Sequence, residues 1–295
     1  MYLSFFTDLL EQDFMQRALV AGIILGMLAP VIGSIVVIRR LSFIADTLGH
    51  FSLVGISVSL FLSTIGFSLF FENPLYLGIL FSVVGGLLVE LFRRSYKNYK
   101  EISMVIVISL GAALSATFFS LAKKTGSLYN YLFGSILTID YNNVFMILLT
   151  AILVFTLFLL FGKQILSVSF EENNAKLLGV NVNLFQILFM IMLSVVVSVL
   201  LEAVGVLLIS SMMIIPIAAA MKVGWSYRST TIIGIVFSEL SVFFGLWMSY
   251  SFMIPSGASI VGINVLILLL VSIIKRIMQY KQLRKDKLSE FLMEE

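Results

Sequence analysis

Cysteine is absent from the 295-residue sequence, histidine occurs once, and charged residues make up only 12% of the chain. The lack of cysteine excludes disulfides, thiol catalysis and Cys-ligated zinc or iron–sulfur sites, and the single histidine excludes any site that needs several imidazoles from one chain. No Gly-x-x-x-x-Gly-Lys-Ser/Thr motif is found, so the chain is not itself a P-loop ATPase. Any chemistry in this protein must therefore use few residues.

Apolar residues are abundant instead: 60% of the chain is hydrophobic and the mean hydropathy is +1.09. Soluble domains contain about 45 to 50% apolar and about 25% charged residues. A membrane-crossing helix needs about 20 apolar residues, so we expect an all-α, polytopic transmembrane helix bundle. The candidate runs are Phe14–Ile38, Leu41–Ser63, Pro74–Phe92, Ile102–Leu121, Asn142–Phe161, Leu184–Leu201, Gly205–Met221, Ser229–Tyr250 and Ser259–Ile274.

The seventh run is the weakest of these nine candidates, because it has 17 residues and contains Pro216. A re-entrant or broken segment buried in protein is the alternative, and the number of full spans would then be eight. The expected organisation is one membrane domain at 14–275, preceded by a short segment at 1–13. A charged tail at 276–295 follows and is expected to extend the last helix.

Basic residues predict how the helices are oriented. If nine spans alternate in direction, sixteen Lys and Arg residues of the loops and tail fall on one side, and only Lys123 and Lys124 fall on the other. Lys and Arg are enriched in cytoplasmic loops, so we expect a multi-pass protein of the cell membrane with residues 1–13 outside and 276–295 in the cytoplasm. Orientation in lipid explains the net charge of +3 without a nucleic-acid partner.

One carboxylate and the only imidazole occur together in the second run. Asp46 and His50 are four residues apart, on one helical face and about 6 Å apart along the axis. This pair suits zinc, or manganese with added water, but two ligands cannot close a tetrahedral site. A two-fold homodimer would double them. The structural alternative is that Asp46 stabilises a helix N-terminus and His50 faces a neighbouring helix.

Three other acids lie in or beside apolar runs, where unpaired charges are costly. Glu90 is expected to pair with the basic stretch that follows it, and Glu202 to face extracellular water. Glu239 lies ten residues inside the eighth run. It either lines a pathway or forms a hydrogen bond inside the bundle.

The loop after the fifth run predicts a short helix on the cytoplasmic face, at about 169–180. Ser169 is a candidate N-cap, and Gly179 a candidate terminator. An ordinary capped surface helix is the simplest interpretation. Its acidic start and its Gly end also match the element by which ABC-importer permeases dock onto an ATPase subunit.

The stretch Ile38–Gly55, with its basic pair followed by Ser, Asp, His and Gly, resembles a signature of the ABC-3 family, the permease subunits of bacterial manganese and zinc importers. Tyr131–Ile136, Val204–Pro216 and Pro255–Ala258 are similar to further family stretches, and the resemblance spans roughly residues 14 to 275. It implies an ABC importer permease type of helix bundle.

The resemblance also implies functional roles and partners. Asp46 and His50 would take part in metal passage, and the loop with Glu171, Glu172, Ala175 and Gly179 would couple the permease to its ATPase. The implied partners are a second copy in a homodimer, ABC ATPase subunits and an extracellular metal-binding lipoprotein. Zn²⁺ or Mn²⁺ would be cargo, and no permanently bound cofactor and no enzymatic activity are expected.

Details of the sequence, notably Arg39–Arg40, Asp46–Leu48 and Tyr131–Ile136, are more similar to zinc permeases of Gram-positive bacteria than to manganese permeases. Two hypotheses of other classes stay open. An ion-gradient-driven metal carrier could use Glu239 as its protonatable group. An integral membrane enzyme is the weakest, because the chain offers no nucleophile with a base and no complete metal site.

Overall fold

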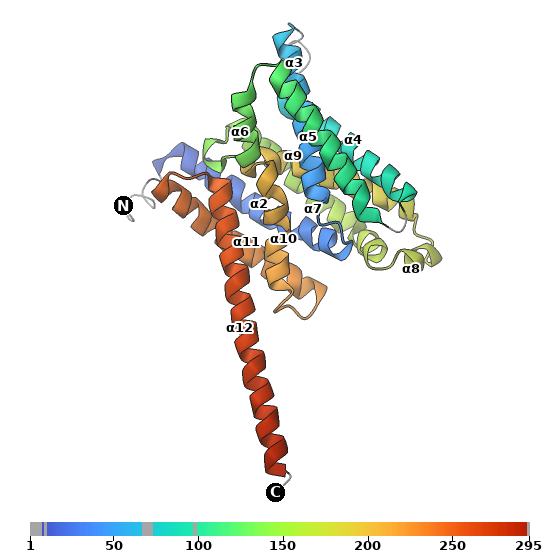
Figure 1. The fold of residues 1–295 in the computed structure, drawn as a ribbon, viewed down its shortest axis with the longest axis vertical. Coiled ribbons are helices and arrows are strands. Elements are labelled where there is room, and N and C mark those ends of the chain that lie inside the picture. Colours follow the sequence, from blue (N-terminus) through green and yellow to red (C-terminus); the bar gives the residue numbers. More distant parts are fainter. Residues whose placement is uncertain (1–7, 9–10, 67–72, 97–98, 294–295) are drawn as a thin grey trace.

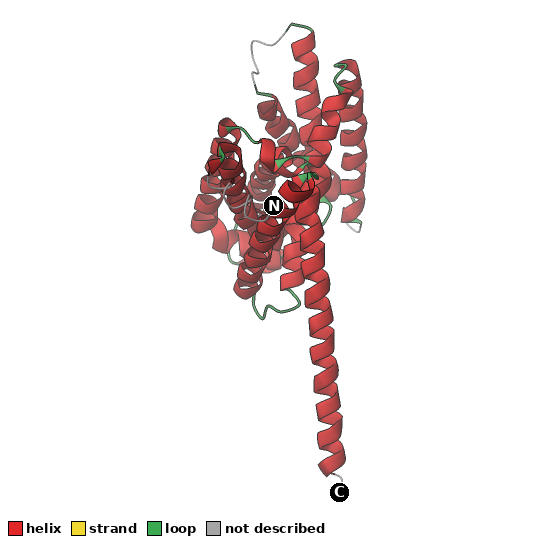
Figure 2. Ribbon diagram, turned by 90° about the vertical axis from the view of Figure 1, so that its left-hand side faces the viewer, coloured by secondary structure: helices red, strands yellow, loops and turns green. Residues whose placement is uncertain are grey.

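The computed structural model describes residues 8, 11–66, 73–96 and 99–293, and the regular elements among them are all helices (Figure 2). This confirms the predicted all-α bundle. The longer helices are α2 (Asp13–Ile38), α3 (Ile44–Thr64), α4 (Pro74–Ser95), α5 (Lys100–Leu121), α7 (Tyr141–Phe170), α9 (Val182–Val204), α11 (Tyr227–Phe252) and α12 (Ser256–Met293). The shorter elements are α6 (Thr125–Phe133), the 3-10 helix η2 (Ile136–Thr138), α8 (Glu172–Leu177) and α10 (Val206–Ala220).

Contacts between helix termini define two ends of the bundle. At one, called the α8 end, Arg39 after α2 donates a hydrogen bond to Ser169 in the last turn of α7, at 3.0 Å. The first residue of α11, Tyr227, contacts Phe170 at the same end. At the other, called the α6 end, Arg17 near the start of α2 pairs with Asp140 before α7, at 3.9 Å. Helices α2 and α7 therefore both run from the α6 end to the α8 end, and α11 begins at the α8 end.

The seventh apolar run forms α10, which has 15 residues and is interrupted by neither Pro216 nor a loop. Among the described helices, eight are long and apolar enough to cross a membrane, and α10 is the shorter apolar one. It begins next to the α6 end and leads to α11, which begins at the α8 end. At about 1.5 Å per residue it is about 22 Å long, less than the roughly 30 Å of a hydrocarbon core. The described part of the chain thus contains eight full-length spans and one shorter apolar segment, α10.

Three glycines bring three distant segments into backbone contact at the α6 end; we call this the three-glycine crossing. A Cβ atom on Gly134 would lie 2.3 Å from the nitrogen of Gly205, and one on Gly257 would lie 2.5 Å from the carbonyl oxygen of Val204. Gly205 has a φ of +86°, which side chains rarely adopt. The crossing joins the three stretches at 131–136, 204–216 and 255–258 that supported the family resemblance.

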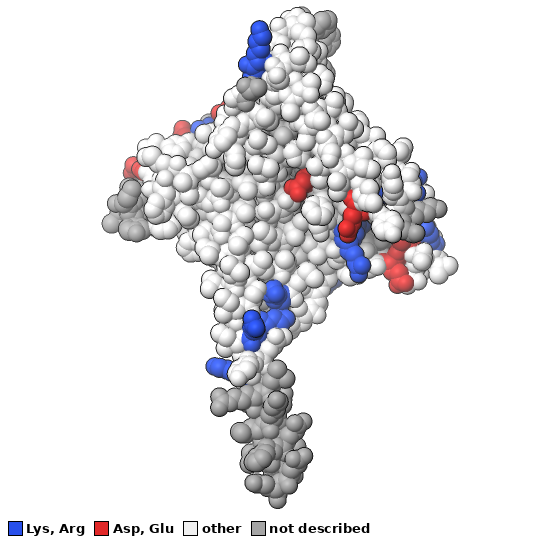
Figure 3. Space-filling model, in the orientation of Figure 1, with Lys and Arg blue, Asp and Glu red and all other residues white. Residues whose placement is uncertain are grey.

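Helix α3 lies inside the bundle and contacts α4, α5, α9 and α10 (Figure 1). Small residues make this possible: a Cβ on Gly55 would lie 2.1 Å from the carbonyl oxygen of Leu77 in α4. Lipid tails are as apolar as leucine, so membrane helices associate through such close packing. The outer helices α7 and α12 instead present apolar side chains, such as Leu159 and Leu270, on the exterior. Figure 3 shows one face of the molecule, which is largely uncharged and carries a few separate acidic and basic groups.

The last helix, α12, extends without interruption over 38 residues and projects from the bundle (Figure 1). The tail at 276–295 therefore continues the final helix as far as it is described. Of the segment 1–13, residues 1–7 and 9–10 lie outside the described residues, and Tyr250 at the end of α11 donates a hydrogen bond to Asp8.

Substituting Gly205 by Ala should destabilise the folded protein. The new Cβ would lie 2.4 Å from the carbonyl carbon of Phe133, and a side chain at this backbone conformation costs roughly 1–3 kcal/mol before any clash. Gly126→Ala in α6 is the control, because no neighbour lies within 4 Å of its added Cβ. Thermal unfolding in detergent should show a clear loss for Gly205→Ala only; equal stability of both variants would contradict the crossing.

Candidate metal pathway

Asp46 lies in the first turn of α3 and is partly exposed. Its carboxylate forms a hydrogen bond with the side chain of Ser210 in α10. A carboxylate in a first turn also interacts favourably with the helix dipole, as the structural alternative proposed. One side of the carboxylate is therefore held by the protein. Ser210 was not singled out in the sequence, because no local pattern connects it with a residue 164 positions earlier.

His50 is one turn further along α3, on the same face, and is also partly exposed. Its Nδ1 atom is buried and has no hydrogen-bond partner among the described residues. Gly111 of α5 lies directly against it, since a Cβ there would be 3.2 Å from the Cβ of His50. A neutral imidazole nitrogen is the commonest protein ligand for transition metals.

By themselves, the two residues do not make a complete metal site. Within the described part of the chain, no group of three or more His, Cys, Asp or Glu side chains could hold a metal ion. Asp46 and His50 are thus residue types that bind zinc or manganese. Two ligands are nevertheless fewer than a closed metal site requires. Such a pair is suited to brief ligation, or to completion by a second copy of the chain.

Glu239 of α11 faces α2, where a Cβ on Gly26 would lie 2.7 Å from its Oε1 atom. That oxygen is buried and has no hydrogen-bond partner among the described residues. A hydrogen bond inside the bundle was one of the two alternatives predicted for Glu239. This oxygen atom does not form it. Glu239 belongs to different helices from the Asp46 and His50 pair, and the structure does not bring the three together as one metal-binding group.

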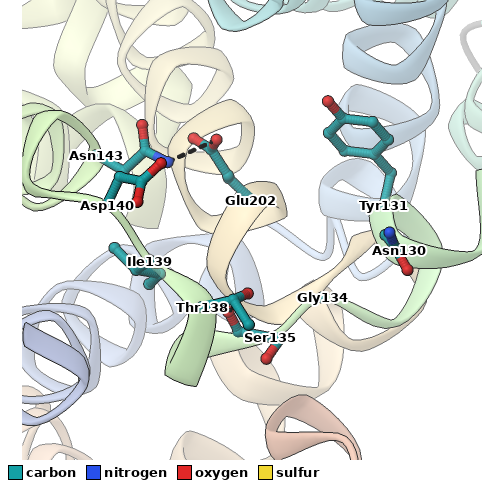
Figure 4. Close-up of a pocket in the computed structure, with 9 residues that line it drawn as sticks. All are labelled: Asn130, Tyr131, Gly134, Ser135, Thr138, Ile139, Asp140, Asn143 and Glu202. Atoms are coloured by element: carbon teal, nitrogen blue, oxygen red, sulfur yellow. Dashed lines mark hydrogen bonds between the residues drawn. The ribbon is translucent and has the colours of Figure 1, made fainter. Parts of the chain in front are cut away.

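A polar cavity of about 420 Å³ lies at the α6 end, beside the three-glycine crossing (Figure 4). Glu202 lines it and accepts a hydrogen bond of 2.7 Å from Asn143; it belongs to the last turn of α9, whereas the sequence had placed it between two helices. Burial, and then the nearby Glu202 carboxylate, raise the pKa of Tyr131 in the same wall, so its phenol stays protonated at neutral pH. The cavity is therefore a polar pocket at the α6 end of the bundle.

At the α8 end, the short predicted helix is present but begins later than expected. Ser169 belongs to the last turn of α7 and its hydroxyl donates to the carbonyl of Ile165, so the prediction that it caps the short helix is wrong. The backbone of Glu171 holds the N-cap position of α8 instead. Gly179, with φ of +80°, ends the helix as predicted, and Val180 closes the terminal turn with a hydrogen bond to the carbonyl of Ala175.

Ala175 is fully buried and packs with Val168 and Val182, so it fixes α8 on α7 and α9 and is not exposed. The exposed surface of α8 comes from other residues. Leu177 is 86% exposed and Leu178 is 77% exposed. Such high exposure is unusual for leucine, and these two leucines lie next to charged residues. The sequence analysis did not single out these two leucines. Their position between Ala175 and the terminating Gly179 could have indicated that they are exposed.

Charged residues around α8 are paired as local patterns predict. Glu172 pairs with Lys176 at 3.0 Å. Glu90 in α4 pairs with Arg93 at 3.4 Å and Arg94 at 3.6 Å, which confirms its predicted contact with the following basic stretch.

The fold and these polar sites define a multi-pass membrane protein. A model described as the ABC 3 transport family matches residues 11–275, so the chain belongs to this family.

Relatives in the family carry names that refer to two metals. The manganese transport system membrane protein MntC of Listeria monocytogenes is 28% identical over 263 residues, covering 89% of this chain and 91% of its own. The high-affinity zinc uptake system membrane protein ZnuB of Buchnera aphidicola is 33% identical over 242 residues, covering 82% and 90%. Among solved structures, PsaBC from Streptococcus pneumoniae in complex with Fab aligns with a TM-score of 0.79 at 27% identity, over 92% of this chain and 95% of that one.

The contact between α3 and α10 that places Asp46 can be tested by a compensating pair of substitutions. A Cβ on Gly49 would lie 2.5 Å from Cγ2 of Val206, so Gly49→Ala should destabilise the protein by about 1–3 kcal/mol. Combining it with Val206→Ala, which removes that methyl group, should recover part of the loss. A double-mutant cycle measured by unfolding in detergent checks this; strictly additive effects would contradict the contact.

Proposed function

We propose that this protein is the permease subunit of an ATP-binding cassette importer for a divalent transition metal. The observation that carries the proposal is the incomplete pair of Asp46 and His50 on the central helix α3, where the imidazole Nδ1 has no hydrogen-bond partner among the described residues. Two copies related by a two-fold axis would supply two carboxylates and two imidazoles. A site shared in this way can form and open as the subunits move, which suits transport better than a permanent closed site.

Zinc is the proposed cargo, and manganese is the second candidate. Nitrogen and oxygen ligands favour zinc over manganese in intrinsic affinity, and one relative is named for zinc uptake. Manganese is supported by the relatives that are named for it. The ligand set accepts both ions, so the choice depends on measured uptake.

The proposed orientation places the α6 end outside the cell and the α8 end in the cytoplasm. Support comes from basic residues at the α8 end, including Arg39, Arg93 and Lys176, and from the directions of α2, α7 and α11. The N-terminal segment would then be extracellular and α12 would end in the cytoplasm. The polar cavity lined by Glu202 would face an extracellular metal-binding lipoprotein.

The proposed docking element for the ATPase is α8, with Glu171, Glu172 and Gly179 from the sequence and the exposed Leu177 and Leu178 from the structure. Two exposed leucines beside a charged pair offer an apolar centre with a polar rim, which is the usual composition of a protein interface. Ala175 acts indirectly here by holding the helix in place. Energy from ATP would enter the permease at this point.

Replacing either proposed metal ligand should strongly lower metal uptake. Asp46→Ala and His50→Ala each remove one of only two ligands per chain, so uptake into proteoliposomes containing the intact complex should fall by roughly 10- to 100-fold or more. Glu101→Gln is the matched control, because Glu101 is an exposed acid in the first turn of α5. Size-exclusion chromatography should show that all three variants assemble. Normal uptake by both ligand variants would contradict the proposed role of Asp46 and His50 in metal passage.

Uptake should also require the ATPase. The chain reconstituted alone should move no metal, since it lacks a phosphate-binding loop of its own, whereas the complete complex with ATP should import radiolabelled zinc. Competition with excess manganese then ranks the two ions. Uptake by the chain alone, driven by a proton gradient, would favour the carrier hypothesis that uses Glu239.

A further inference from the structure

Arg39 connects the two functional regions of the protein, the ATPase-docking region and the metal-ligand helix. It follows the last residue of α2 and precedes α3 by a four-residue connection. Its Nε donates a hydrogen bond of 3.0 Å to Ser169 Oγ at the end of α7, directly before α8. The Ser169 hydroxyl in turn donates to the carbonyl of Ile165, so its oxygen is turned to accept from the guanidinium.

A further contact and the nearby charges also act on the guanidinium. Its Cζ lies 4.7 Å from the centre of the Phe189 ring in α9, a cation–π contact. Burial lowers the pKa of Arg39 to about 10, with Arg93 adding to this, while the acids Glu90 and Glu172 oppose it. The side chain therefore stays charged at neutral pH, and it links α2, α7 and α9 beneath the start of α8.

The connection from Arg39 to α3 is short and closed by hydrogen bonds. Arg40 takes a left-handed conformation with φ of +55°. The nitrogen of Leu41 bonds to the carbonyl of Val36 at 3.0 Å, and the nitrogen of Ile44 bonds to Leu41 at 2.9 Å. Leu41 is itself buried. A displacement of Arg39 would therefore move the first turn of α3, where Asp46 lies, because the connection has little freedom to absorb it.

We propose that Arg39 is a positioning residue that transmits movement of α8 to the metal ligands on α3, through its hydrogen bond to Ser169 and its stacking on Phe189. The inference rests on the proposed function of α8 and of the Asp46 and His50 pair. Energetic coupling between sites passes through packed contacts and hydrogen bonds of this kind. Lysine could not replace the arginine, because it lacks both the Nε donor and the planar group that stacks.

The test measures transport and hydrolysis together, in proteoliposomes that contain the permease, the ATPase and the binding protein. Arg39→Lys keeps the charge and removes the planar fork, and Ser169→Ala removes the acceptor alone. Both should lower the number of zinc ions imported per ATP hydrolysed by about tenfold, a change typical of coupling between two sites. Hydrolysis itself and equilibrium zinc binding to the complex should stay near the wild-type level. Arg40→Lys, the same change at the exposed neighbouring residue, is the matched control and should behave as wild type.

An unchanged import-to-hydrolysis ratio in Arg39→Lys and Ser169→Ala would overturn the inference, as would a parallel loss of zinc binding, which would assign Arg39 to the metal site itself. If Arg39→Lys does not assemble, Ser169→Ala decides the question. Failure of the proposed function is distinguishable, because then the wild-type complex would import no zinc or His50→Ala would import it normally.

Discussion

Close contact between helix backbones at glycine is the constraint on which this structure depends. In a bilayer there is little hydrophobic drive for one helix to pack on another, so association relies on shape and on small residues. Gly49 and Gly111 bring α10 and α5 against the face of α3 that carries Asp46 and His50. Larger residues at these positions would separate the helices. The position of the Asp46 and His50 pair therefore depends on the absence of side chains at the neighbouring glycines.

The same constraint bears on where the few polar groups of this apolar bundle are found. Polar groups are concentrated at two levels, the cavity around Glu202 and the Asp46 and His50 pair on α3, with Ser210 linking α3 to α10. This pair leaves a histidine nitrogen unpaired within the described chain. Burying an unpaired polar atom is unfavourable, so its persistence is better explained by a partner or ligand than by stability.

Apolar run length and loop charge were enough to predict the helices and their order, since both follow directly from the bilayer as solvent. The Asp46 and His50 pair was equally accessible, because a spacing of four on one helix is a local property. Contacts between segments that are distant in the sequence could not be predicted in this way. The helix-capping role assigned to Ser169 was wrong because α7 continues two turns beyond its apolar run, and that hydroxyl is used by Arg39, 130 residues away in sequence. Likewise, nothing local indicates that Gly134, Gly205 and Gly257 meet.

The shortness of α10 has an electrostatic consequence. A segment of about 22 Å leaves less low-dielectric material between the cavity at one end and the aqueous phase at the other than the roughly 30 Å of an undisturbed bilayer. With water at both of its ends, this segment would carry the transmembrane voltage over a shorter distance than the surrounding lipid does. A voltage of 100 mV is worth about 2.3 kcal/mol per elementary charge, hence about twice that for a divalent cation. With the proposed orientation and a negative cell interior, this field points inward and helps to draw the cation through.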